Sequence, residues 1–435
     1  MAKVLIAGGG LAGLSAAAAL GGAGYDVELY ESRPFLGGRA TSYTLPGAGG
    51  TESEGETVDN CQHILLRCCT NLLDFYTRLN VRDRIKFYRE FYFLEPGGRI
   101  SVLKRGRFPA PFHFSGSFLR LHCLNRQDKT GIAKALLAMR RERTRRKDLD
   151  KISMLDWLLQ KRQTPNAIGR FWRQILVSAV NEDLERMAAI HGFQVFWHGF
   201  LSRSDSYEMG IPSIPLGQLY STEAWRRLSN VRMHFRAPVE HIDAGGFMVR
   251  GQRRTADHYV VALPFERLES VGLPAPKLGH SPITGIHLWF DREVTTLPHA
   301  TLLDRTMQWM FNKDSGRYLQ LVVSASRDLT PLSRAEIIDM AIGDLRLYFP
   351  RVRDAQLVKA HVIKEQRATF SAAPETEHLR STPDCGIPNV FLAGDWTRTG
   401  WPATMEGAVR SGYIAAEWVA QAAGKPAKFV VPDVG

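Results

Sequence analysis

The stretch KVLIAGGGLAGLSAAAALGGAGYDVELYE, residues 3–31, decides the fold. A short apolar run, Val4 to Ala7, predicts a β-strand, and a glycine-rich turn and an alanine-rich helix follow it. A second apolar run, Val27 to Tyr30, predicts another strand and ends at Glu31. This order of strand, turn, helix, strand and acidic residue predicts a Rossmann-like unit that binds a dinucleotide.

Three glycines in the turn, Gly8, Gly10 and Gly13, have the G-x-G-x-x-G spacing of phosphate-binding turns. Gly8 allows the tight turn, Gly10 lets the backbone approach a pyrophosphate, and Gly13 lets the helix pack close to the strand. Leu11 and Ala12 begin the helix, so we expect its N-terminus to face the phosphates.

Glu31 and Ser32 follow the second strand, where a carboxylate accepts hydrogen bonds from ribose hydroxyls. The uncharged stretch from Val4 to Tyr25, preceded by Lys3, is also compatible with a signal peptide or a membrane span. Its many glycines argue against a stable span, and a strand ending in Glu31 would have no role in a cleaved leader. We therefore interpret residues 3–31 as a dinucleotide site.

The next motif, SRPFLGGRA, contains Gly37, Gly38, Arg39 and Ala40. Two glycines permit a close backbone approach, and the arginine can donate to phosphate or flavin oxygens. Taken alone, the motif favours an ordinary Gly-Gly turn with a surface arginine. Directly after the acidic end of a second strand, it resembles the extended FAD motif of the amine oxidase and phytoene desaturase superfamily.

That resemblance gives a role to GDWTRTGWPATMEGAVRSG, residues 394–412. In the superfamily a C-terminal strand ends in Gly-Asp, whose aspartate bonds the ribitol of FAD, and here the matching residues are Gly394 and Asp395. The helix that follows points its N-terminus at the flavin pyrimidine, and here it begins at Thr404 and Met405. The resemblance thus implies that this segment covers the redox end of FAD.

Two further features of the cofactor site follow from the resemblance. Val239 resembles the superfamily residue whose backbone meets the adenine. Some amine oxidases tether flavin through a C-terminal cysteine, but residues 396–404 contain none, so we expect non-covalent FAD.

The elements along the chain predict an α/β fold in which a Rossmann-like FAD-binding domain is interleaved with an α+β substrate domain. FYREFYFLEPGGRISVL predicts a hairpin, residues 110–228 look mostly helical, and three runs after residue 281 look like strands of a substrate-domain sheet. We expect a discontinuous FAD domain that comprises residues 1–85, 229–280 and 385–424. Residues 86–228 and 281–384 form a substrate and membrane-facing domain, and residues 425–435 form a C-terminal tail.

Cysteine use argues against a metal site and for a reducing compartment. The five cysteines have no metal-ligand spacing, and their odd number and sparse use suit the cytoplasm. We therefore expect a cytoplasmic enzyme without a metal ion.

The chain is basic, with a formal net charge of +12. Arginines and lysines cluster in KALLAMRRERTRRKDLDK, which includes Arg140 to Lys147, and the cluster follows an aromatic segment that contains Phe108, Phe112, Phe114 and Phe118. Basic residues beside apolar ones are typical of a membrane-surface site, which implies peripheral attachment to the inner face of the cell membrane. A solvated helix face with core phenylalanines is the alternative. No nucleic-acid reader motif accompanies the charge, so we expect no nucleic acid.

Several motifs resemble one branch of the superfamily, the hydroxysqualene dehydroxylases, also called squalene-associated FAD-dependent desaturases. They are VDNCQHI at residues 58–64, FPAPFH after the hairpin, FWRQILVSAVNED with Asn181 near its end, and residues 394–412. One departure is Cys61, where the branch has glycine, and it puts the local flavin geometry in question.

The resemblance implies reduction of hydroxysqualene to squalene in squalene and hopanoid biosynthesis. Hydroxide is a poor leaving group, so the oxygen needs a proton or a strong hydrogen bond, and the allylic cation that remains takes a hydride from reduced flavin. His63 is the first candidate for the acid, Asp205 and Glu208 are weaker candidates, and Trp401 is a candidate wall of the flavin cavity. Ordinary structural roles remain the alternatives: a backbone-bonded histidine, a solvated loop and a core tryptophan.

Other functions stay open. A carotenoid or phytoene-type desaturase would transfer hydride in the opposite direction on a similar polyene. An amine oxidase fits less well, because a basic protein poorly suits a cationic substrate. A non-enzymatic prenyl-binding protein resembling the Rab GDP-dissociation inhibitors would not need the complete FAD motif. The electron donor is also open: the chain shows no second dinucleotide motif, which leaves NAD(P)H binding transiently or another protein.

Overall fold

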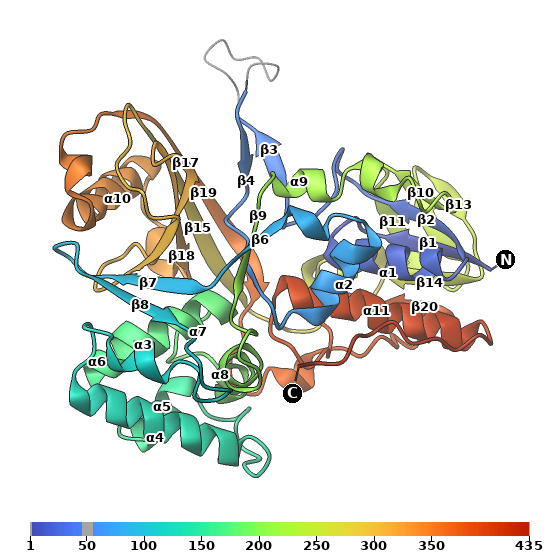
Figure 1. Ribbon diagram of the computed structural model, residues 1–435. Coiled ribbons are helices and arrows are strands. Elements are labelled where there is room, and N and C mark those ends of the chain that lie inside the picture. Colours follow the sequence, from blue (N-terminus) through green and yellow to red (C-terminus); the bar gives the residue numbers. More distant parts are fainter. Residues whose placement is uncertain (1, 46–54, 435) are drawn as a thin grey trace.

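We describe the protein from a computed structural model, which describes residues 2–45 and 55–434. Figure 1 shows a parallel sheet with helices α1 and α11 at the right, a larger sheet with helix α10 at the upper left, and helices α3 to α8 below that sheet. The polypeptide crosses between these regions several times, as the interleaved arrangement of strands along the sequence requires.

A five-stranded parallel sheet holds the N-terminal glycine motif, as the sequence predicts. Its strands come from three distant parts of the chain, in the order β10-β2-β1-β14-β20. A small antiparallel sheet of β11, β12 and β13 follows β10 in sequence. The bounds are β1 Lys3–Ala7, β2 Asp26–Tyr30, β10 Val231–His234, β11 Val239–Asp243, β12 Gly246–Val249, β13 Gln252–Arg254, β14 His258–Val261 and β20 Val390–Leu392.

Helices α1 (Leu11–Gly22) and α11 (Met405–Ala422) pack directly against each other beside this sheet. A Cβ atom at Gly412 would lie only 2.1 Å from the Ala12 carbonyl oxygen, so only glycine permits the contact. The Ser15 hydroxyl lies 3.1 Å from the Val409 carbonyl oxygen and donates a hydrogen bond across the same interface. The two ends of the chain are thereby joined where the sequence predicts one cofactor site.

A seven-stranded sheet forms the second layer, in the order β19-β15-β18-β17-β16-β7-β8. All its neighbouring strands are antiparallel except β16 and β7. One face packs on α10 (Arg334–Tyr348), and side chains of the other face, such as Trp309 and Phe311, belong to the core that also contains the helices between residues 115 and 201. The bounds are β7 Glu90–Leu94, β8 Ile100–Lys104, β15 His280–Phe290, β16 His299–Leu302, β17 Trp309–Asp314, β18 Tyr318–Ser324 and β19 Leu357–Phe370. The predicted hairpin and the three predicted strands are confirmed.

The segment between residues 110 and 228 is mostly helical, as expected, and two π-helical turns, η3 and η4, interrupt it. The helices are α3 Ser115–Leu119, α4 Arg126–Glu142, α5 Met154–Gln160, α6 Pro165–Ala167, η3 Ile168–Trp172, α7 Arg173–Val180, α8 Ala189–Phe196, η4 Trp197–Leu201 and α9 Leu216–Leu219. Elsewhere lie α2 Thr70–Arg78 and two small sheets, β3 Ser42–Thr44 with β4 Thr57–Asp59, and β5 Leu65–Leu66, β9 Met209–Pro212 and β6 Ile85–Tyr88.

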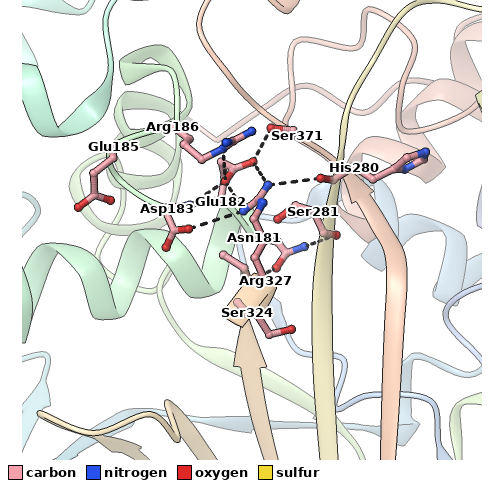
Figure 2. Close-up of polar contacts among 12 residues, drawn as sticks. Asn181, Glu182, Asp183, Glu185, Arg186, His280, Ser281, Ser324, Arg327 and Ser371 are labelled. Atoms are coloured by element: carbon pink, nitrogen blue, oxygen red, sulfur yellow. Dashed lines mark hydrogen bonds and ion pairs between the residues drawn. The ribbon is translucent and has the colours of Figure 1, made fainter. Parts of the chain in front are cut away.

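A buried ionic cluster joins the end of α7 to the seven-stranded sheet (Figure 2). Glu182 is fully buried and accepts two hydrogen bonds from Arg327, at 2.7 and 2.8 Å, and another from the Ser371 hydroxyl. Asn181 has a left-handed backbone, and its amide donates to the Ser281 carbonyl oxygen at 3.1 Å. The asparagine that the sequence singled out is therefore a helix-terminating residue at a junction between two layers.

The aromatic segment before α4 is divided between surface and core. Phe108 and Phe112 are 64% and 57% exposed. Phe114 instead packs on Phe200, with ring centroids 6.1 Å apart, and Phe118 packs on Phe171 at 5.9 Å. Phe114 and Phe118 are partly buried against the helical core, so Phe108 and Phe112 are the two exposed phenylalanines of the segment, and the membrane contact stays a prediction.

The arginine run at the end of α4 is divided in the same way. Arg143 lies over the Trp197 ring at 4.0 Å, and Arg146 forms ion pairs with Asp148 and Glu142. The other cations of the run are exposed and form no ion pair within the part of the chain that the structure describes; they are Arg140, Arg141, Arg145 and Lys147.

Candidate active site

The turn between β1 and α1 has the geometry of a phosphate-binding site. Gly8 has a φ of +106°, and a Cβ atom there would lie 2.5 Å from the Ala262 carbonyl oxygen. A Cβ atom at Gly13 would lie 1.9 Å from the Gly8 carbonyl oxygen, so α1 can approach β1 only with glycine at this position. Gly10, by contrast, has open space where its Cβ would be, and no side chain caps α1 there. The N–H groups of the first helical turn, from Leu11 onward, are therefore available to an anion.

Glu31 closes the glycine turn from the side. Its buried carboxylate accepts hydrogen bonds from the backbone N–H of Gly9 and of Arg33, both at 2.7 Å, and from the Ser32 hydroxyl at 3.0 Å. The Glu31 carbonyl oxygen also accepts from Ala237 N–H, which brings the segment leading to Val239 beside it. The structure thus assembles the residues that the sequence assigned to the adenosine end.

We expect Glu31→Ala to weaken FAD binding by about 1–3 kcal/mol, because the variant loses a buried carboxylate that orders the Gly9 turn and is predicted to bind the ribose. Titration of the apoprotein with FAD, followed by flavin fluorescence quenching, measures the change. Glu223→Ala is the control, since Glu223 is exposed outside this site. Equal affinities of both variants and wild type would remove Glu31 from the site.

The second glycine pair lies directly against the first. Gly37 N–H donates to the Gly9 carbonyl oxygen at 2.8 Å, and Gly37 and Gly38 have φ values of +100° and +64°. A Cβ atom at Gly38 would lie 3.1 Å from the Gly10 Cα. The two halves of the predicted FAD motif therefore form one continuous backbone surface, which ends at Arg39 and Ala40.

Arg39 and Asp395 are joined by two hydrogen bonds of 2.8 and 2.9 Å, although they are far apart in the sequence. Arg39 also donates to the Ala368 carbonyl oxygen at 2.7 Å. The sequence assigned Arg39 to phosphate or flavin oxygens and Asp395 to the ribitol. Their contact places these two predicted ligands side by side.

A buried arginine that the sequence analysis missed holds the loop after β20. Arg380 is 2% exposed, and its guanidinium donates to the carbonyl oxygens of Asp395 and Thr397 and, at 3.1 Å, to the Thr399 hydroxyl. Its signal in the sequence is weak, because it lies in a loop with no motif around it.

The N-terminus of α11 faces α2. Thr404 caps α11 by accepting a hydrogen bond from Gly407 N–H at 3.0 Å, and Met405 is the first helical residue. The buried Glu406 carboxylate accepts from the backbone N–H of Asn71 and of Leu72, at 3.1 and 2.8 Å, and so caps α2 as well. Burial raises the pKa of Glu406 to about 7, and the hydrogen bonds from α2 oppose this rise.

An apolar cavity of about 160 Å³ opens beside this helix start. It lies between α2, α7, η4 and the inner face of the seven-stranded sheet, and Glu406 is the one Asp, Glu, Lys or Arg side chain among its described lining residues. The aromatic lining residues are Phe91, Phe93, Phe200, Trp309 and Trp401, and the polar ones include Gln174, Ser178, Gln194, His198 and Thr301.

Trp401 lies in the wall of this apolar cavity, and its role as a wall of the flavin cavity stays a prediction. Its ring stacks on His198 with centroids 5.3 Å apart, and its indole N–H donates to Asp433 at 3.0 Å. Trp401 therefore links the cavity to the end of the described chain and is held in one orientation.

His63 is not a lining residue of the apolar cavity, whereas its neighbour Ile64 is. Its Nδ1 donates to the Cys61 carbonyl oxygen at 2.8 Å. Lys313, from β17, donates to Gln62 at 2.9 Å and forms an ion pair with Asp59. Burial lowers the pKa of His63, so the imidazole is mainly neutral at neutral pH.

Cys61 fits this chain because a glycine stands opposite it. The Cys61 sulfur would lie 3.1 Å from a Cβ atom at Gly285 on β15. The thiol is buried, and burial raises its pKa to about 12. The extra room that a cysteine needs at this position is thus supplied by the sheet.

The two acidic candidates lie outside the cavity lining. Asp205 pairs with Arg203 at 3.0 Å near the surface. Glu208 is buried, but it pairs with Arg67 at 2.7 Å and with Arg89 at 3.3 Å. These ion pairs favour structural roles for both carboxylates.

Three features are together typical of an FAD-dependent oxidoreductase: a backbone surface for phosphates, an acidic residue beside it, and an aspartate of the distant C-terminal segment, Asp395, which meets this surface at Arg39. A family described as flavin containing amine oxidoreductase matches residues 11–420, and the chain belongs to this family. FAD is therefore its cofactor.

The chain is also similar to individual proteins along nearly its whole length. A 15-cis-phytoene desaturase of Synechococcus elongatus is 25% identical to this chain over 460 residues, which cover 95% of each protein. A zeta-carotene desaturase of Synechocystis sp. is 24% identical over 480 residues, or 95% of this chain and 96% of that one. An oxidoreductase of Methanosarcina mazei has a similar structure, with a TM-score of 0.71 at 17% identity, covering 94% of this chain and 98% of that one. The predicted fold, an FAD-binding domain with a substrate domain, is confirmed.

Proposed function

We propose that this oxidoreductase reduces hydroxysqualene to squalene, in squalene and hopanoid biosynthesis. The observation that carries the proposal is the apolar, aromatic-lined cavity next to the N-terminus of α11. Its one acidic lining residue, Glu406, is occupied by the N–H groups of α2, so the cavity offers no free counter-charge for a cationic amine. Two relatives are named for carotenoid substrates, which supports a long isoprenoid chain as the substrate class.

The chain's own residues can meet the chemical demands of this reaction. Bound FAD, when reduced, supplies the hydride. The faces of Trp309, Phe91 and Phe93 can stabilise positive charge on an allylic carbon, because aromatic rings attract cations. The apolar wall excludes water, which would otherwise trap the cation. His63 is the proposed proton donor to the departing hydroxide, although it does not line the cavity itself. The proposal rests on its neighbour Ile64, which lines the cavity, and on the resemblance of VDNCQHI to a segment that the superfamily places near the flavin.

The direct test is anaerobic incubation of the chemically reduced holoenzyme with hydroxysqualene, followed by chromatographic analysis of the products. Squalene formation, with one flavin oxidised per squalene, is the expected result. A carotenoid-type desaturase is the second candidate, because the named relatives are desaturases. It predicts no squalene, and instead reduction of the oxidised enzyme by phytoene. The electron donor, NAD(P)H or another protein, is found by asking which one re-reduces the flavin.

The substrate also suggests where the enzyme works. Each methylene moved from apolar surroundings to water costs roughly 0.8 kcal/mol, so a long isoprenoid should be taken from a bilayer rather than from the cytoplasm. Within the described residues, no helix combines the length and the apolar character that crossing a membrane needs. We therefore propose peripheral attachment to the inner face of the cell membrane.

The segment between β8 and α4 is the best-supported membrane contact. Phe108, Phe112 and Leu119 are exposed there, among the exposed cations Arg105, Arg107 and Arg120. Residues 104–122 contain no acidic residue. This segment lies close to the cavity, because Leu103 of the preceding strand β8 lines the cavity and Phe114 packs on the lining residue Phe200. A membrane contact here would open toward the cavity.

Replacing Phe108 and Phe112 with serine should lower binding to anionic vesicles by about tenfold or more, since each buried aromatic side chain contributes up to roughly 1.5–3 kcal/mol. Vesicle flotation measures the change, and added salt should also weaken binding through screening. Val358→Ser is the control, because Val358 is 68% exposed on β19, at the opposite edge of the sheet from β8. Unchanged flotation of the double variant would exclude this surface and return attention to Arg140 to Lys147.

A further inference from the structure

The apolar cavity contains two polar atoms that lack partners. The Gln174 Oε1 and the Thr301 Oγ1 are buried, and neither makes a hydrogen bond within the described residues. Both residues line the cavity. A buried polar atom without a partner costs free energy, and nearly all such atoms in folded proteins are paired. A pair of unpaired oxygens in a substrate cavity therefore points to a polar group of the ligand.

The contacts of Gln174 and Thr301 determine which of their polar atoms have no hydrogen-bond partner. The Gln174 Nε2 donates to the Gly169 carbonyl oxygen at 3.1 Å, which sets the amide orientation and leaves Oε1 as the unpaired acceptor. Thr301 lies on β16, paired with Phe93 on β7 and with Trp309 on β17. Its neighbours on both sides are thus aromatic lining residues that offer its hydroxyl no side-chain partner.

A hydrogen-bonded bridge holds the two sides of the cavity together. The Trp309 indole N–H donates to the Ser178 hydroxyl at 2.6 Å, and that hydroxyl donates to the Gln174 carbonyl oxygen at 2.8 Å. Ser178 lies one turn after Gln174 on α7, while Trp309 is the strand neighbour of Thr301. The two unpaired oxygens therefore belong to one connected part of the wall, and the bridging groups are already satisfied.

The hydrogen-bonding capacities of the two oxygens match one ligand group. An amide oxygen only accepts, whereas a threonine hydroxyl can donate, and an alcohol donates one hydrogen bond and accepts others. We propose that Gln174 and Thr301 bind the hydroxyl of an isoprenoid alcohol. The Gln174 Oε1 accepts a hydrogen bond from this hydroxyl, and the Thr301 Oγ1 donates one to its oxygen. This inference rests on the proposed function and names the residues that select its substrate.

The consequence is discrimination against the hydrocarbon of the same length. A site built to hydrogen-bond a hydroxyl rejects the analogue without it, because its own polar groups are then left unpaired. Squalene, the proposed product, lacks the hydroxyl, so the same two residues would also favour product release. A desaturase of pure hydrocarbons would gain nothing from them.

Binding to the oxidised holoenzyme tests this inference, because oxidised flavin cannot deliver a hydride and no turnover interferes. Hydroxysqualene and squalene in detergent micelles are titrated separately, with the flavin difference spectrum and tryptophan quenching as readouts. Wild type should prefer the alcohol by about 10- to 100-fold, the effect of one or two buried hydrogen bonds. The double variant Gln174→Leu/Thr301→Val should bind squalene as before and lose most of that preference.

The matched control is Gln127→Leu/Thr130→Val, which changes the same residue types at exposed positions of α4 and should keep the full preference. Equal binding of both ligands by wild type, a preserved preference in the double variant, or an equal loss for both ligands would overturn the inference. Squalene formation is scored separately. Wild type that prefers the alcohol but makes no squalene would reject the proposed reaction and leave the hydroxyl site standing.

Discussion

His63→Ala is expected to slow squalene formation by a factor of about 10² to 10⁴ while leaving FAD bound, the usual effect of removing a general acid. The Nδ1 of His63 donates to the Cys61 carbonyl oxygen, so the ring is held in place and Nε2 is the atom that can carry the second proton. Single-turnover oxidation of reduced holoenzyme by hydroxysqualene measures the rate. Flavin absorbance of the purified variant checks that the cofactor is retained.

The pH profile separates an acid from a structural histidine. Burial lowers the pKa of His63 below its ordinary value, so its protonated form becomes abundant only as the pH falls through that lowered pKa. A rate that depends on protonated His63 should therefore rise toward acid pH in wild type. His63→Ala should lose this rise, and the exposed-site control His378→Ala should keep it. If His63→Ala kept the wild-type rate and pH profile, the role of proton donor would have to be assigned to bound water or to Glu406, which lines the cavity.

The cofactor site could be predicted from sequence because backbone geometry determines it locally. The positive φ of Gly8 and the close approach at Gly13 each exclude larger residues, so the spacing of the glycines records the shape of the turn. Gly38 touches Gly10 for the same reason, and Asp395 follows a strand whose end is visible in the sequence. Such motifs need no knowledge of distant contacts.

The substrate cavity could not be predicted in the same way. Gln174 lies on a helix, Thr301 on a strand far along the chain, and Glu406 on the last helix. Each looks like an ordinary polar residue in its own segment, and only the packing of α7 on the inner face of the sheet brings the first two to one wall. The ion pair of Glu208, a candidate acid, could not be predicted either, because its partner Arg67 is distant in the sequence.

The exposure of the four phenylalanines before α4 could not be predicted from the sequence either. Phe108 and Phe112 are exposed, whereas Phe114 and Phe118 are partly buried, although all four lie in or next to one short irregular segment. The sequence of this segment has no helical or strand periodicity from which the exposed residues could be predicted. We therefore propose a membrane contact for the exposed residues Phe108 and Phe112, and we add Leu119 because it is exposed as well.

Arg327→Leu is expected to destabilise the protein by about 3–5 kcal/mol, because it leaves the fully buried Glu182 carboxylate without its bidentate partner. Figure 2 shows Arg186 and Ser371 near Glu182 as well. Neither can replace Arg327, because Arg186 is 57% exposed and 3.6 Å from Glu182, and the Ser371 hydroxyl carries no charge. Chemical denaturation of the holoenzyme gives the change in the free energy of unfolding.

The matched control is Arg173→Leu, which removes an arginine from the first position of α7. Arg173 pairs with Glu185 and Asp183 where all three side chains are partly exposed, so its loss should cost only about 0–1 kcal/mol. Equal stabilities of the two variants would show that Glu182 needs no cation.

The Arg327 variant should also change ligand binding, because Asn181 and Glu182 follow the helix that carries Gln174 and Ser178. A loosened junction should shift α7 against the sheet that carries Thr301 and Trp309. Arg327→Leu should therefore reduce the preference for hydroxysqualene over squalene even under conditions where the variant remains folded, and Arg173→Leu should not.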